Sequence, residues 1–305
     1  MFGDIAKYVN TADIAIGTME TNFTQEEYSG YLKYNSPRSF AEAVQNTGID
    51  VVSIAHNHSL DYRIQGLKDT KSTLEELGYT IVGAKTTLEE KNYVIREVKG
   101  IKIAFLAYTY GFSNAETLST EDMQYVNQFD QEQVKQDLEL ARGDADYLCV
   151  MMHWGDVNST SASEEQKKTA DFLIENGADM IVGAHPSVPQ PMEVKQNAEG
   201  ENVFVSYSVG NYISSLGYEN SNLEMILNIQ IRKQAEDGKV ILEKVTYTPV
   251  YVVDYGTKAE NQFVLVDMKE TARRYASGET DIVSRKVYDQ LVAGVEKLEE
   301  IIRRK

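Results

Sequence analysis

The sequence has few cysteines, few prolines and little positive charge. Its one cysteine, Cys149, lies in the apolar run YLCVMM, so no disulfide can form within the chain and a buried free thiol is expected. No apolar run reaches the length of about 18 residues that spans a bilayer, and no basic and apolar export signal follows Met1. The prediction therefore contains no thiolate metal site and no membrane-spanning helix.

Basic residues are outnumbered, with 30 Lys and Arg against 47 Asp and Glu and a net charge of -17. Nucleic acids and anionic lipid surfaces need clustered positive charge, so both are excluded as expected partners. Ordinary solubility is the simplest explanation of the acidic surface. The chain also lacks a glycine-rich phosphate loop and a Gly-x-Ser-x-Gly elbow. Its 305 residues, 42% of them hydrophobic, are enough to bury a large core.

Apolar runs and helical patterns alternate as far as residue 190, and longer alternating strands joined by a hairpin signal, AEDG, follow. We expect strands at 14–17, 51–55, 81–83, 101–108, 147–152, 180–182, 203–208, 223–234 and 239–253. We expect helices at 2–9, 39–47, 65–77, 131–142, 163–176 and 282–304. Helices alternating with strands predict a layered α/β fold.

The segment SIAHNHSLDYRIQGLKDT places His56, Asn57 and His58 between an expected strand and an expected helix. In open α/β sheets, ligands bind outside the carboxyl ends of the strands, which favours a functional site at this loop. The alternative is a simple turn, because Asn and His tolerate unusual backbone angles and cap helices. This segment alone does not decide between the two interpretations.

Three further polar residues follow expected strands: Glu20 in ADIAIGTMETNF, His153 in VMMHWGD and His185 in MIVGAHPSVPQPMEV. Separately, Glu20 could be a solvated carboxylate and His153 a core residue. Together, however, all four histidines of the chain fall at the carboxyl ends of three strands. Imidazoles with an amide and a carboxylate offer nitrogen and oxygen donors, which suit Zn, Mn or Fe better than Ca. The pattern predicts a metal-assisted hydrolase.

The motifs AHNHSLDYRIQGLKDTKSTLEELGYTIVGA, MMHWG, QKKTADFLIENGADMIVGAHPSVPQPMEV and VFVSYSVGNYI resemble those of the bacterial capsule synthesis family (CapA/PgsA), associated with poly-γ-glutamate production. The resemblance runs from about residue 13 to residue 213. This family in turn is similar to the calcineurin-like metallophosphoesterases. The resemblance implies an α/β fold, a four-layer αββα sandwich of the metallophosphoesterase type, forming a single domain over 1–305 with 269–305 as a C-terminal helical extension.

The resemblance also implies roles for individual residues. It assigns the metal ligands as a group: Glu20, Asn57, His153 and His185. His58 would face the substrate and donate a proton to a leaving group, and Asp61 fits the acid that follows it. His56 takes the place of an Asn, and neither the pattern nor the resemblance gives it a role.

Three departures from the family pattern bear on the metal. Thr18 replaces an Asn, and Ser187 replaces the second histidine of a His-Pro-His motif. The segment FGD at the start is similar to the family's first ligand motif, but it lies on an expected helix and no strand precedes it, so the first strand of the fold is expected to be missing. We therefore expect one divalent metal ion (Zn, Mn or Fe) and the loss of a second site.

Two functions remain open. The first is metal-assisted hydrolysis of a phosphoester or a related envelope-polymer linkage. The second is a non-catalytic binding or assembly module of a cell-surface polymer system, with a degenerate metal site. The resemblance implies an extracytoplasmic location, a small-molecule or cell-surface polymer substrate, and membrane-associated polymer-synthesis proteins as partners.

Overall fold

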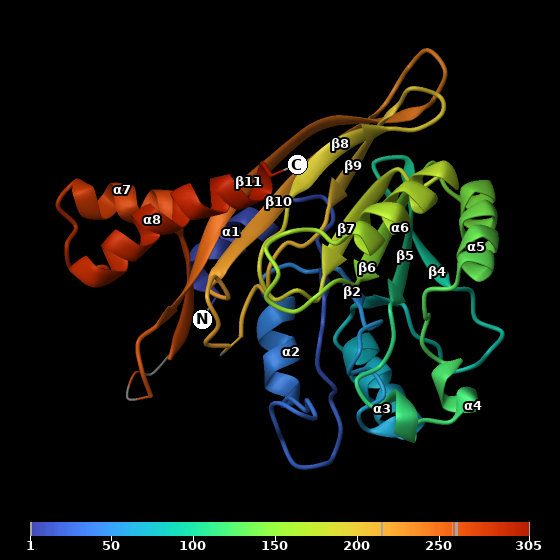
Figure 1. The fold of residues 1–305 in the computed structure, drawn as a ribbon, viewed down its shortest axis with the longest axis horizontal. Coiled ribbons are helices and arrows are strands. Elements are labelled where there is room, and N and C mark those ends of the chain that lie inside the picture. Colours follow the sequence, from blue (N-terminus) through green and yellow to red (C-terminus); the bar gives the residue numbers. More distant parts are fainter. Residues whose placement is uncertain (1, 215, 258, 260–261, 305) are drawn as a thin grey trace.

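The computed structural model describes residues 2–214, 216–257, 259 and 262–304 (Figure 1). The helices are α1 (Gly3–Val9), α2 (Arg38–Gln45), α3 (Arg63–Glu76), α4 (Thr120–Met123), α5 (Gln131–Asp144), α6 (Glu164–Glu175), α7 (Met268–Ala276) and α8 (Arg285–Ile302). The strands are β1 (Ile16–Thr18), β2 (Val51–Ser53), β3 (Thr80–Val82), β4 (Tyr93–Val98), β5 (Ile101–Thr109), β6 (Tyr147–His153), β7 (Met180–Ala184), β8 (Met192–Gln196), β9 (Asn202–Ser206), β10 (Leu223–Lys233), β11 (Val240–Asp254) and β12 (Phe263–Asp267). Within these ranges, no helix is long and apolar enough to cross a membrane.

The main sheet has the strand order β4-β5-β6-β7-β9-β8. Its four central strands are parallel, while β4 and β8 pair antiparallel at the two edges. Along β6, side chains alternate between two cores: Cys149 and Met151 point to one, Leu148 and Val150 to the other. A strand buried on both faces needs apolar residues at successive positions, which explains the continuous run YLCVMM.

Helices α5 and α6 cover one face of the main sheet, where Leu138 and Leu173 pack beside Leu148. The N-terminus of α6 is fixed by a capping box between Ser163 and Gln166, which satisfies backbone amides that the first turn leaves free. This face forms the first pair of layers, helix on sheet.

Two smaller sheets, β1-β2-β3 and β10-β11-β12, share the core on the opposite face of the main sheet. Helices α2 and α3 pack into the same core beside β1-β2-β3, and α7 and α8 cover the outer face of β10-β11-β12. Figure 1 shows α7 and α8 on one side of the molecule and α5 on the other. The order is therefore helix, sheet, sheet, helix, and the expected four-layer α/β sandwich is confirmed.

The first element is the helix that the sequence predicted. Helix α1 buries Ile5 and Val9 and leaves Asp4 exposed in its first turn. As the sequence predicted, the segment FGD begins a helix and does not end a strand, and Asp4 lies on the surface of that helix.

Candidate metal centre

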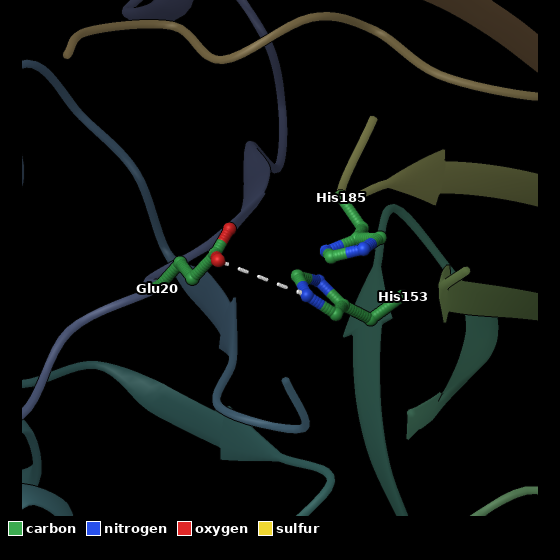
Figure 2. Close-up of side chains that lie close together, drawn as sticks. All are labelled: Glu20, His153 and His185. Carbon is green, nitrogen blue, oxygen red and sulfur yellow. Dashed lines mark ion pairs between the residues drawn. The ribbon is translucent and has the colours of Figure 1, made fainter. Parts of the chain in front are cut away.

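Four predicted site residues come from the carboxyl ends of neighbouring strands. His153 is the last residue of β6 and His185 follows β7, while Asn57 follows β2 and Glu20 follows β1. Because β1 pairs parallel with β2 and β6 with β7, the ends of each pair lie at the same sheet edge. Figure 2 shows Glu20, His153 and His185 pointing toward one another.

The candidate ligand atoms of these residues lie close together. One ligand atom each from Glu20, His153 and His185 falls within 4.8 Å of the others. His153 Nε2 is 2.7 Å from Asn57 Oδ1 and 3.9 Å from Glu20 Oε1. Two ligands each about 2.1 Å from an ion are at most about 4.2 Å apart, and about 2.7–3.0 Å apart at an angle near 80–90°. Both measured distances fit this range.

The donor set also fits a divalent metal chemically. His153 Nδ1 and His185 Nδ1 are buried without a hydrogen-bond partner among the described residues, whereas His153 Nε2 lies at hydrogen-bonding distance from Asn57 Oδ1. The set combines two imidazoles, an amide oxygen and a carboxylate, and the Glu20 side chain is 29% exposed. Mixed nitrogen and oxygen donors of this kind suit Zn, Mn or Fe.

Burial controls the charge of the cluster. It lowers the pKa of His185 to about 4, and that of His153 well below its usual range, because the charged ring loses its hydration and lies near other imidazoles. Burial raises the pKa of the Glu20 carboxyl to about 7, with His58 acting in the opposite direction. At neutral pH both rings are therefore uncharged and keep a free lone pair, the form in which imidazole binds a metal.

His58 and Asp61 form a second group beside this cluster. His58 Nδ1 lies 2.9 Å from Asp61 Oδ2, which also accepts from the backbone amide of Tyr34 at 3.0 Å. The Tyr34 ring meets His58 edge-on, with ring centroids 4.5 Å apart. An ionised carboxylate only accepts hydrogen bonds, so His58 carries a proton on Nδ1 and its Nε2 is left for another partner. Both side chains are buried.

The turn after β2 explains how Asn57 and His58 are presented. The hydroxyl of Ser59 donates to the Ile54 carbonyl at 2.7 Å and accepts from the His56 amide at 2.9 Å, which closes the chain on itself. The segment is thus a turn, and it also carries Asn57 of the cluster and His58 of the second group. The two interpretations left open by the sequence are compatible.

Two contacts of the centre could not be anticipated from sequence motifs. Ser113 accepts a hydrogen bond from Asn57 Nδ2 at 2.6 Å and donates its own amide to the Asn57 carbonyl at 2.9 Å, so Asn57 Oδ1 is turned toward His153. The Tyr110 ring lies 5.0 Å from that of His185 and stacks 6.4 Å from that of His153. Both residues lie in a loop that follows β5, and this position after a strand was the only available signal.

The loop after β7 depends on Gly183. A Cβ at this position would lie 2.0 Å from the Tyr207 carbonyl oxygen and 2.5 Å from Trp154 Nε1, so only glycine allows this close approach. His185 then adopts a φ of +100°, an unfavourable backbone conformation for a non-glycine residue. Ser187, which replaces a family histidine, donates its hydroxyl to the His185 carbonyl at 3.2 Å.

Comparison with known proteins gives a consistent set of relatives. Residues 1–216 match the family described as "Bacterial capsule synthesis protein PGA_cap". The capsule biosynthesis protein CapA of Bacillus anthracis is 27% identical over 256 residues, which cover 80% of this chain and 60% of that protein. The PGA biosynthesis protein CapA of Bacillus subtilis (strain 168) is 28% identical over 239 residues, which cover 76% and 61%. The chain thus spans about 60% of the length of these curated relatives.

Among solved structures, the NAD nucleotidase (NadN) of Haemophilus influenzae is similar at 15% identity and a TM-score of 0.47. The match covers 86% of this chain and 48% of that one.

Proposed function

The chain belongs to the bacterial capsule synthesis protein family, and from this membership we propose that it is a metal-dependent hydrolase acting on a phosphoester or a related linkage of a cell-surface polymer. The proposal is supported above all by the short distances from His153 Nε2 to Asn57 Oδ1, 2.7 Å, and to Glu20 Oε1, 3.9 Å. The relatives are named for capsule and PGA biosynthesis, which supports a cell-surface polymer as the substrate and an extracytoplasmic site of action.

The proposed metal ligands are Glu20, Asn57, His153 and His185. When bound there, a Zn, Mn or Fe ion would supply Lewis acidity, which polarises a phosphoryl oxygen and lowers the pKa of water. The neutral rings of His153 and His185 keep their lone pairs available, and Ser113 holds the amide of Asn57 with its oxygen toward His153. The Glu20 carboxylate is the only anionic ligand of the four.

His58 is the proposed proton donor. Its Nδ1 proton is held by Asp61, which in turn is fixed by the backbone amide of Tyr34. A ring anchored in this way can carry a second proton on Nε2 and release it to a leaving group, while Asp61 stabilises the charged ring. Asp61 thus orients the ring, and His58 moves the proton.

A binding or assembly module remains the second candidate, and one observation favours it. Asp4 lies exposed on α1, and the Ser187 hydroxyl already donates to the His185 carbonyl, so neither contributes to a second ion site among the described residues. Two-metal catalysis is therefore not part of the proposal. With at most one ion, the centre could instead stabilise a surface that binds a polymer or a synthesis protein.

A substrate screen separates the two candidates. Wild type, Glu20→Gln and Glu27→Gln are assayed on mono- and diesters of p-nitrophenyl phosphate with added Mn²⁺ or Zn²⁺. Glu27 is an exposed glutamate and serves as the matched control. Metal-dependent turnover that Glu20→Gln abolishes and Glu27→Gln retains supports the hydrolase. Absence of turnover in the wild type with either metal favours the module.

A further inference from the structure

His56 is almost completely buried, at 1% exposure, yet it belongs to neither the metal-ligand group nor the proton-donor group. Its Nδ1 lies 3.2 Å from the backbone nitrogen of His58. Its ring also forms a hydrogen bond with the backbone of Met19, and the ring centroid lies 6.0 Å from that of His153. The ring therefore contacts the chain on both sides of the centre, next to Glu20 and next to Asn57.

The partners fix the position of the proton on this ring. A backbone N–H only donates, so the amide of His58 requires a bare, accepting nitrogen at His56 Nδ1. A neutral imidazole with a bare Nδ1 carries its proton on Nε2. The hydrogen bond to the Met19 backbone must then run from Nε2–H to the carbonyl oxygen. Each nitrogen has one partner of the right kind, so the ring is held in a single tautomer.

The two partners adjoin the residues that the proposed function needs. Met19 immediately precedes Glu20, and His58 immediately follows Asn57. The loop after β1 and the turn after β2 lie at the ends of two paired strands, where Asn22 Nδ2 also donates to the His58 carbonyl at 2.9 Å. A rigid ring bonded to both backbones holds these segments at a fixed separation, and with them the carboxylate and the amide oxygen.

We propose that His56 is a positioning residue that, as the neutral Nε2–H tautomer, ties the Met19 backbone to the His58 backbone and so sets the distance between Glu20 and Asn57, without binding the metal itself. The proposal rests on the proposed metal centre for its functional meaning. The tautomer and the two backbone contacts can be tested without any metal.

Two substitutions separate the contact of the ring with His58 from its contact with Met19. Asparagine places an oxygen where Nδ1 lies but does not reach the Met19 carbonyl. Glutamine places an N–H near the position of Nε2 but offers no acceptor at Nδ1. His56→Asn should therefore keep the contact to His58 and lose the one to Met19, and His56→Gln should do the reverse. Both variants retain a polar side chain of similar size, so each is expected to fold.

The first measurement is ¹⁵N NMR of histidine-labelled, metal-free protein at neutral pH, with the His56 signals identified by their loss in His56→Asn. The expected result is an unprotonated Nδ1 and a protonated Nε2 in one tautomer. A proton on Nδ1, a mixture of tautomers or a charged ring would overturn the proposal. Hydrogen exchange at the His58 amide should be faster in His56→Gln than in His56→Asn, and equal rates would count against the contact.

The second measurement is Mn²⁺ titration calorimetry on wild type and both variants, with urea unfolding as a control for stability. Loss of a group that orients metal ligands typically weakens metal affinity about 10–100-fold. Both variants should show a loss in that range while still binding the same number of ions as wild type. Unchanged affinity would refute a positioning role, and complete loss of one ion would make His56 a ligand instead. If wild type binds no Mn²⁺, the proposed function fails, and the NMR results alone decide the two backbone contacts.

Discussion

Gly183→Ala gives a sharp test of how the His185 loop is built. A Cβ at residue 183 would lie 2.0 Å from the Tyr207 carbonyl oxygen and 2.6 Å from its carbonyl carbon, whereas ordinary van der Waals contact begins near 3.4 Å. The shortfall of about 1.4 Å is against backbone atoms of the chain leaving β9, which cannot rotate away as a side chain can. Overpacking usually costs about 1–3 kcal/mol, and we expect about 3 kcal/mol here because both neighbouring strands would have to separate.

The matched control for this substitution is Gly143→Ala. Gly143 lies in α5, and a Cβ added there would meet no atom within 4 Å, so alanine should stabilise the helix by about 0.5–1 kcal/mol. Urea unfolding of both variants measures the two free energies. Because Gly183 lies two residues before His185, Gly183→Ala should also weaken Mn²⁺ binding more than tenfold. Equal stability of the two variants would refute the close-approach argument.

Three further predictions follow from contacts of the centre. Ser113→Ala should weaken Mn²⁺ binding roughly 2–10-fold, because Asn57 loses one hydrogen bond worth about 0.5–1.5 kcal/mol. Ser113→Thr should restore the affinity, and equal affinities of wild type and Ser113→Ala in calorimetry would exclude an orienting role for Ser113. His58→Ala should remove any metal-dependent turnover, and turnover at the wild-type rate would exclude His58 as proton donor. The same variant should lower the free energy of unfolding by about 1–3 kcal/mol, since it leaves the buried Asp61 without its ring partner. The folded-state pKa of His185 lies below its unfolded value, so its neutral form stabilises the metal-free fold above about pH 6.5, and this contribution is lost as the pH falls toward about 4. Between pH 7 and 5, the free energy of unfolding of wild type in urea should therefore fall by about 2 kcal/mol more than that of His185→Asn. Parallel pH profiles of the two proteins would contradict this.

The central strands were predictable because they are buried on both faces. The run YLCVMM has to be apolar throughout, since β6 lies between two cores, and this continuity is visible in the sequence. Strands β4 and β8 were missed because they form the edges of the main sheet. Their sequences, YVIREV and MEVKQ, mix apolar and charged residues, and each strand leaves both an apolar and a charged side chain exposed, so they do not differ clearly from loops.

The helices were predicted to within a few residues where they carry an apolar face, as in α5 and α6. Helix α7 was missed. Its sequence MKETARRYA buries only Met268 and Thr271, and the cap at Asp267 is a weak signal without an apolar stripe.

The histidines of the centre could be located from the sequence because parallel strands end at one sheet edge, so residues 153 and 185 had to lie near each other. Their partners could not. Ser113 reaches Asn57 across 56 positions of the chain, from a loop whose path no local pattern determines. The role of His56 depends on which of its nitrogens faces which backbone atom, and a sequence does not contain that information.

The most direct test of a single-ion hydrolase is the metal content of the protein purified without chelator and then supplied with Zn²⁺, Mn²⁺ or Fe²⁺. Elemental analysis should give one equivalent per chain for wild type and close to none for a His153→Ala, His185→Ala double variant, with Glu27→Gln as the matched control at one equivalent. Two equivalents in wild type would contradict the single-ion centre. No ion after metal addition would contradict the hydrolase and favour the binding module.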